Sequence, residues 1–322
     1  MLLHALLIII GVALVLWGAD RLTEGAAGVA RRMRVSEIVI GLTIVAAGTS
    51  APELFVSVMS ALKGTTDMAV GNVIGSNIFN GLLIVGCAAM VAPMSISPST
   101  VQKDIPFAVG ASLLLLVLCM DGWQHLSIQG NHISRLDGCW LLLGFVAFMY
   151  YTFSTAKSNA SSEAPAESIV DMPVWKGLLW VFVGLTCLVV GSNLFVSSAA
   201  RIAMQLGISD GVIGLTIVAG GTSLPELATS VVAARKGQSA IAIGNVIGSN
   251  VFNILLILGL TAVISPMQIG GITTVDVSMM LISVVLIWLF SYTRYTVERW
   301  EGGVLTALFL AYMGWLLYSL TI

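Results

Sequence analysis

Charged residues are scarce in this chain. Asp, Glu, Lys and Arg make up only 9% of its 322 residues, against roughly 25% in a typical soluble domain, and the net charge of −2 offers no basic surface for nucleic acid. Because 57% of the residues are hydrophobic, the composition predicts a chain embedded in a lipid bilayer. The cysteines lack metal or redox spacing and are interpreted as packing residues in apolar stretches; they are Cys87, Cys119, Cys139 and Cys187.

No basic leader precedes the first apolar segment, since the first basic residue, Arg21, follows it. We therefore expect a retained helix rather than a cleaved signal peptide. Such segments, close to the roughly 20 residues that a membrane helix needs, recur along the chain. The predicted fold class is an all-α integral membrane protein with ten transmembrane helices, at residues 2–19, 36–62, 69–91, 105–120, 136–153, 174–192, 209–234, 241–264, 277–292 and 303–320.

Basic residues are divided unequally between the loops. The odd-numbered loops hold 11 Lys and Arg residues, whereas the even-numbered loops hold only Lys63, Arg135 and Arg201. Basic loop residues collect on the cytoplasmic side of a membrane. We expect a multi-pass protein of the cell (inner) membrane, with the central linker in the cytoplasm and both termini outside.

The sequence contains an internal repeat. Residues 41–86 and 214–259 are identical at 31 of 46 positions, without a gap, at an offset of 173. Residues 1–153 and 174–322 are therefore predicted to be two five-helix repeats, joined by a flexible linker at residues 154–173. Five is an odd number, so the repeats cross the membrane in opposite directions. Secondary transporters with inverted repeats bind their cargo near the midplane, where interrupted helices meet.

Two glutamates, Glu53 and Glu226, lie at equivalent positions deep inside apolar segments. A charge at that depth costs about 2.5–3.5 kcal/mol on insertion scales, so it indicates function; a structural hydrogen bond is the alternative, and a symmetric pair makes it less plausible. Pro52 and Pro225 precede them, and each removes a helical N–H donor. We expect a broken helix there, with backbone carbonyls facing a cavity.

Small and polar residues lie at helical spacing on both sides of each glutamate and along the next segment. Because no His or Cys is among them, these hard oxygens suit Ca2+, Mg2+ or Na+ better than zinc or copper. Two bidentate glutamates and the carbonyls of Thr49 and Thr222 reach the lower end of the about 6–8 oxygens that Ca2+ takes. Shared use of the same oxygens by Na+ predicts antiport, with ions as cargo and no cofactor. The predicted stripes are Ala46, Thr49, Ser50, Glu53 and Ser57 with Asn72, Ser76 and Asn80, and Ala219, Thr222, Ser223, Glu226 and Ser230 with Asn245, Ser249 and Asn253.

Other polar and small residues in the same segments are interpreted as packing features. Asn77 and Asn250 point away from the stripes, and we expect them only to join helices. Glycine pairs spaced by four residues permit close helix contact; these are Gly71 with Gly75 and Gly244 with Gly248.

The two motif pairs resemble those of the sodium/calcium exchangers and their cation/calcium exchanger relatives. They are GTSAPE at residues 48–53 with GSNIFN at 75–80, and GTSLPE at 221–226 with GSNVFN at 248–253. The resemblance implies Ca2+ on Glu53 and Glu226 with the Thr49 and Thr222 carbonyls. It further implies Na+ sites that add Ala46, Ala219, Ser50, Ser223, Ser76 and Ser249, with Asn80 and Asn253 lining the centre.

One departure concerns Asn253, because several relatives, including potassium-dependent ones, have Asp there. The predicted function is Na+/Ca2+ antiport by alternating access, for which one copy of the chain is sufficient. A proton/calcium antiporter, in which the coupled glutamates take up protons, and a cation channel remain open alternatives. An enzyme is not expected, since a hydrolase using Ser50 or Ser223 would need a base. The histidines lie near segment ends or in a loop; they are His4, His125 and His132.

Overall fold

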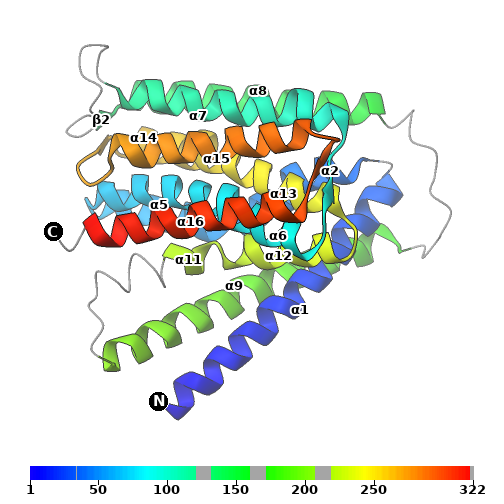
Figure 1. The fold of residues 1–322 in the computed structure, drawn as a ribbon, viewed down its shortest axis with the longest axis horizontal. Coiled ribbons are helices and arrows are strands. Elements are labelled where there is room, and N and C mark those ends of the chain that lie inside the picture. Colours follow the sequence, from blue (N-terminus) through cyan, green and yellow to red (C-terminus); the bar gives the residue numbers. More distant parts are fainter. Residues whose placement is uncertain (34, 121–131, 160–171, 207–218, 320–322) are drawn as a thin grey trace.

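The structure, a computed structural model, describes all residues except 34, 121–131, 160–171, 207–218 and 320–322 (Figure 1). The helices of the first half of the chain are α1 (Leu2–Met33), α2 (Glu37–Ile40), the π-helix η1 (Gly41–Val45), α3 (Ala46–Thr49), α4 (Ala51–Leu62), α5 (Thr66–Ile78), η2 (Phe79–Ile84), α6 (Val85–Val91), η3 (Thr100–Asp104), α7 (Ile105–Cys119) and α8 (Arg135–Asn159). Those of the second half are α9 (Val174–Gln205), α11 (Ala219–Thr222), α12 (Leu224–Arg235), α13 (Ser239–Val251), η5 (Phe252–Leu258), α14 (Gly259–Ile264), α15 (Thr274–Tyr292) and α16 (Arg299–Ser319).

The predicted class of an all-α membrane protein is confirmed. The described part contains eight helices long and apolar enough to cross a membrane. Counted as one span, the broken pair formed by Glu37–Thr49 and Ala51–Leu62, which is bent by 46°, makes a ninth. The seventh expected segment, residues 209–234, is described only from residue 219 onward, so the structure does not cover all ten expected helices.

Two helices are much longer than the sequence predicted. α1 continues to Met33 instead of residue 19, and α9 continues to Gln205 instead of residue 192. The continuation of α1 is rich in Ala and Gly, and much of it is buried against other helices. Each helix has 32 residues, about 48 Å at 1.5 Å per residue. That length exceeds the roughly 30 Å hydrocarbon layer, and both helices slant across the others (Figure 1).

Glycines explain how α1 and α9 lie side by side. Three glycines of each helix, spaced by seven residues, meet three of the other: Gly11 with Gly191, Gly18 with Gly184, and Gly25 with Gly177. A Cβ atom on Gly18 would lie 2.8 Å from the carbonyl oxygen of Gly184, and one on Gly184 would lie 2.7 Å from that of Gly18. The two backbones therefore touch, and a side chain at these positions would separate them.

The predicted glycine contacts of the motif helices are confirmed in the second half. A Cβ on Gly244 would lie 2.9 Å from the Ile38 carbonyl oxygen, and one on Gly248 would lie 2.8 Å from that of Leu42. Gly75 differs, because it is exposed and a Cβ there would meet no described atom within 4 Å. Residues 214–218 are equivalent to η1 in the second half and would be the expected partner of Gly75, but they lie outside the described part.

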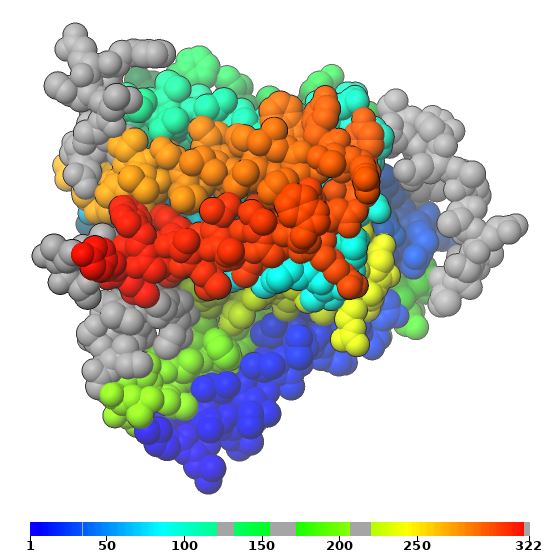
Figure 2. All heavy atoms as spheres, in the orientation of Figure 1, coloured from blue at the N-terminus to red at the C-terminus, as the bar shows by residue number. Residues whose placement is uncertain are grey.

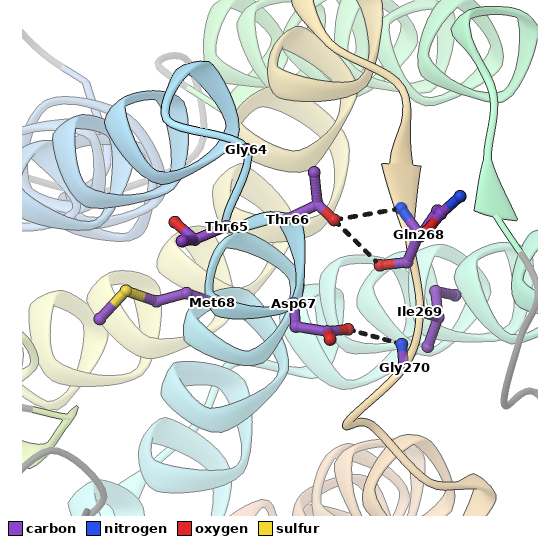
Figure 3. A pocket seen from close by; sticks show the side chains of 8 residues that line it. All are labelled: Gly64, Thr65, Thr66, Asp67, Met68, Gln268, Ile269 and Gly270. Carbon is purple, nitrogen blue, oxygen red and sulfur yellow. Dashed lines mark hydrogen bonds between the residues drawn. The ribbon is translucent and has the colours of Figure 1, made fainter.

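Short strands and a polar contact join the two halves at the helix ends. The strands β1 (Met94–Ser95) and β4 (Thr296–Val297) pair antiparallel, as do β2 (His132–Ile133) and β3 (Met267–Gln268). Beside β3, a pocket of about 700 Å³ lies at the start of α5. There the Asp67 carboxylate accepts a hydrogen bond of 2.5 Å from the backbone N–H of Gly270, and Thr66 bonds to the Gln268 backbone (Figure 3). None of the predicted ion ligands lines this pocket, so we interpret it as part of the brace between the halves.

The structure differs from the prediction in the length of the helix before the linker and in the exposure of one cysteine. α8 continues through Asn159, into the expected linker of residues 154–173, and residues 160–171 lie outside the described part. All four cysteines are free thiols. Cys119 is buried, whereas Cys139 is exposed on α8, so the interpretation as a packing residue is wrong for Cys139. α15 and α16 cover one face of the molecule, while α1 projects at its edge (Figure 2).

Candidate ion-binding site

The predicted helix breaks are present in both halves. Ser50 (φ −82°, ψ 6°) separates α3 from α4, and Ser223 (φ −90°, ψ 8°) separates α11 from α12. Pro52 and Pro225 stand in the first turn after each break, where a missing N–H is tolerated. The carbonyl oxygen of Gly221, four residues before Pro225, accepts a bond of 2.6 Å from the Ser192 hydroxyl on α9. A carbonyl freed by proline thus finds a new partner outside its own helix.

Each glutamate lies in the first turn after its break, and its side chain contacts the opposite half of the chain. Glu53 is 0% exposed and Glu226 is 1% exposed. The Ser50 hydroxyl donates to Oε1 of Glu226 at 3.2 Å, and the Ser223 hydroxyl donates to Oε1 of Glu53 at 3.2 Å. The offset of 173 relates Ser50 to Ser223 and Glu53 to Glu226, so the same contact is made twice with the two halves exchanged.

The partner helices complete the site. The Ser76 hydroxyl on α5 lies 3.2 Å from the Ser223 hydroxyl, so it joins the hydrogen-bonded chain that leads to Glu53. Ser249 on α13 is fully buried. Asn80 and Asn253, each 1% exposed, lie one residue inside the π-helices η2 and η5. Such π-helical turns are frequent at functional sites.

Buried oxygens without a hydrogen-bond partner collect at the predicted site. In native structures nearly all buried polar side-chain atoms are paired, so an unpaired one indicates a missing partner. Within the described part of the chain, the unpaired atoms that belong to predicted ligands are Oε2 of Glu53, Oε2 of Glu226, Oδ1 of Asn80, Oδ1 of Asn253 and Oγ of Ser249. All are carboxylate, amide or hydroxyl oxygens, which are the ligand atoms that hard cations prefer.

The threonines and alanines of the prediction flank the breaks. Thr49 ends α3 and Thr222 ends α11, so both threonines border the breaks. Ala46, which begins α3, is fully buried. Ala219 begins α11, and its side chain lies outside the described atoms.

The sequence comparison decides the family. The profile of the family described as "Sodium/calcium exchanger protein" matches residues 3–154 and 176–318. The chain belongs to this family. It is therefore a multi-pass membrane protein of an ion transporter family, and the resemblance carried by the two motif pairs is confirmed.

Individual members of the exchanger family resemble the chain over its whole length. The candidate antiporter CaxA of Alkalimonas amylolytica is 38% identical over 328 residues, which cover 99% of this chain and 100% of the relative. The sodium/calcium exchanger MaX1 of Methanosarcina acetivorans is 32% identical over 343 residues, which cover 97% and 98%. The solved structure of the sodium-calcium exchanger NCX_Mj, soaked with 2.5 mM Na+ and 0.1 mM Ca2+, superimposes with a TM-score of 0.83 at 31% identity and covers 98% of each chain.

Two asparagines of this exchanger hold the glutamate helices. The sequence placed Asn72 in a ligand stripe, but its Nδ2 donates to the Glu53 carbonyl oxygen at 3.2 Å and to Ser57 Oγ at 2.9 Å. The second half repeats both bonds, from Asn245 to the Glu226 carbonyl (3.4 Å) and to Ser230 (3.0 Å). The Oδ1 of Asn245 also accepts a bond of 3.0 Å from Thr49. Asn245 thus uses both ends of its amide within the protein and braces the helix that carries the glutamate.

Two further asparagines were set aside in the sequence analysis, although they touch the predicted ligands. Asn250 accepts a hydrogen bond from Asn80, and Asn77 accepts one from Asn253. Both do join helices, as expected, but the helices belong to opposite halves. Spacing alone could not reveal these bonds, because each depends on where the other half of the exchanger lies.

Proposed function

We propose that this member of the exchanger family exchanges Na+ for Ca2+ across the membrane at one shared site. The observation that carries the proposal is the pair of buried glutamates, each with one oxygen held by a serine of the other half and one oxygen unpaired. Two carboxylates supply two negative charges, which balance one Ca2+. Several Na+ can instead share the same carboxylates with the surrounding neutral oxygens, so the two cargoes exclude one another.

We propose one set of ligands for Ca2+ and additional ligands for Na+. Glu53 and Glu226 with the carbonyl oxygens of Thr49 and Thr222 serve Ca2+, for which about 6–8 oxygens are typical. The unpaired oxygens of Asn80, Asn253 and Ser249 support a wider set of neutral ligands. The Na+ ligands that we propose in addition are Ala46, Ala219, Ser50, Ser223, Ser76 and Ser249, with Asn80 and Asn253 lining the centre.

We infer alternating access from the repeat. Residues 1–153 and 174–322 form the two inverted halves in this proposal, and the site lies where their broken helices meet, as in other transporters with inverted repeats. The linker of residues 154–173 faces the cytoplasm, and both termini lie outside the cell (inner) membrane. The proposal needs one copy of the chain, since both halves of the site come from the same polypeptide.

A proton/calcium antiporter is the second candidate. No basic side chain pairs with Glu53 or Glu226 among the ion pairs of the described residues. Two buried carboxylates without a cation from the protein can be neutralised by protons instead of Na+, and their titration would then be coupled. This candidate differs from the first only in the counter-ion, so the counter-ion decides between them.

The test is uptake of radiolabelled Ca2+ into proteoliposomes that contain the purified full-length protein. Vesicles loaded with Na+, K+ or buffered protons are diluted into medium without the loaded ion, and empty liposomes provide the background. We expect the outward Na+ gradient to drive saturable uptake, and the K+ and proton gradients to drive little. Uptake driven by protons but not by Na+ would establish the second candidate. Flux that needs no counter-ion on the far side would indicate a channel.

A further inference from the structure

Four asparagines, two from each half, meet at the centre of the molecule. Nδ2 of Asn80 donates to Oδ1 of Asn250 at 3.1 Å, and Nδ2 of Asn253 donates to Oδ1 of Asn77 at 3.3 Å. All four side chains are at most 2% exposed. Adding 173 turns Asn77 into Asn250 and Asn80 into Asn253, so the two bonds are one contact repeated by the pseudo-twofold axis.

The bond to the amide nitrogen determines where the amide oxygen lies. A side-chain amide has an NH2 donor at one end and a carbonyl oxygen at the other. Because the partner's oxygen holds Nδ2 of Asn80 and Asn253, their Oδ1 atoms are turned away from Asn250 and Asn77. Both Oδ1 atoms are buried and unpaired within the described part of the chain. A buried acceptor without a partner is unfavourable, so each indicates a ligand that the protein does not provide.

A separate contact fixes the amide of Asn77 itself. Its Nδ2 lies 3.7 Å from Sδ of Met280 on α15, which is 1% exposed. Sulfur is a weak acceptor and cannot donate. With its NH2 end directed at Met280, Asn77 presents Oδ1 to Asn253. The contact therefore favours one of the two possible orientations of the Asn77 amide, and through it one orientation of Asn253.

We propose that Asn77 and Asn250 are positioning residues of the ion site. Asn77 holds the amide of Asn253, and Asn250 holds the amide of Asn80, with Oδ1 in each case directed to the ions and NH2 directed away. Without these bonds either amide could present its NH2 end, which repels a cation. This assignment rests on the proposed function, since it concerns how the site binds its cargo, but it names residues outside the predicted ligand set.

Replacing the acceptor by an apolar side chain of similar shape tests the proposal. In Asn77→Leu and Asn250→Leu we expect the half-saturating concentrations of Ca2+ and Na+ for exchange in proteoliposomes to rise about tenfold. That change equals about 1.4 kcal/mol, within the range of one hydrogen bond. The maximal rate should change less than the affinity. Asn77→Gln and Asn250→Gln keep a neutral amide acceptor and add no charge; they should recover part of the affinity, which a loss of packing alone would not explain.

A second readout does not depend on transport. The thermal unfolding midpoint of each purified full-length variant is measured in detergent, with CaCl2 or NaCl as the only added salt, because an ion that binds the folded state raises the midpoint. The Leu variants should need about tenfold more ion than the wild type for the same rise. If the Leu variants do not fold, Asn77→Ala and Asn250→Ala replace them.

The outcomes separate the two proposals. A wild type that exchanges Na+ for Ca2+, with folded variants of unchanged ion affinity, would overturn the positioning role and leave the proposed function intact. A wild type without Na+-driven Ca2+ flux, but with ion affinity that falls in the Leu variants and returns in part in the Gln variants, would overturn the proposed function and support the positioning role. A wild type whose midpoint responds to neither ion would overturn both.

Discussion

The hydroxyl of Ser50 lies 3.2 Å from Oε1 of Glu226, and this contact crosses from one half of the chain to the other. Its counterpart joins Ser223 to Glu53 at the same distance. Neither glutamate is therefore positioned by its own half alone, and each keeps Oε2 unpaired within the described residues. Each carboxylate therefore has its serine contact only when both halves are assembled.

The first prediction follows from that arrangement. Glu53→Gln and Glu226→Gln should each abolish Ca2+ uptake in proteoliposomes, because Gln keeps the size of the side chain but removes one of the two charges that balance Ca2+. Glu24→Gln is the matched control, since Glu24 is a partly exposed member of an ion pair with Arg21 on α1. Size-exclusion profiles should match the wild type for all three variants. Near-normal uptake by either site variant would show that its glutamate is not a ligand.

A second prediction concerns the contact between α1 and α9. Gly184→Ala would place a Cβ 2.7 Å from the Gly18 carbonyl oxygen and 2.7 Å from the Leu22 backbone nitrogen. Both are backbone atoms, so the helices must separate, at a cost of about 1–3 kcal/mol. The thermal unfolding midpoint in detergent should fall. The control is Gly110→Ala on α7, where the glycine is exposed and a Cβ would meet no described atom within 4 Å; equal midpoints for both variants would contradict the prediction.

The sequence was informative where chemistry is concentrated in few residues. Both breaks could be predicted because Pro52 and Pro225 each remove a backbone donor, and the glutamates stood out because a buried charge needs a function. The lengths of α1 and α9 could not be predicted, since beyond the apolar run their stability comes from packing against other helices. The bond from Asn253 to Asn77 was missed for the same reason: its partner is 176 residues away.

A third prediction concerns orientation, and two equivalent turns provide the test. Lys63 and Arg235 are both exposed and lie beside turns with left-handed glycines, Gly64 (φ +79°) and Gly237 (φ +74°). The excess of basic residues in the odd-numbered loops predicts that Arg235 faces the cytoplasm and Lys63 the outside. In a cysteine-free background, an impermeant thiol reagent added to intact cells should label Lys63→Cys, and Arg235→Cys only after the cells are opened. The reverse pattern would invert the topology.

The last prediction is that Asn253 makes transport independent of K+. With Asn at this position, the two glutamates give the central site two negative charges, which match one Ca2+ without an extra monovalent cation or proton. Asn253→Asp adds a third charge and removes the NH2 group that bonds to Asn77 at 3.3 Å. To donate to the new carboxylate, Asn77 would have to turn its amide and give up its contact with Met280. The variant should therefore bind an additional cation to balance the site.

The measurement compares Na+-driven Ca2+ uptake in K+-containing and K+-free vesicles at several pH values around neutrality. We expect the wild type to be indifferent to K+ and the Asn253→Asp variant to gain a dependence on K+ or on protons. Asn193→Asp controls for the added charge, because Asn193 is exposed on α9, and this variant should behave as the wild type does. If the wild type itself requires K+ for Ca2+ flux, position 253 does not determine the coupling, because a neutral amide then coexists with potassium dependence.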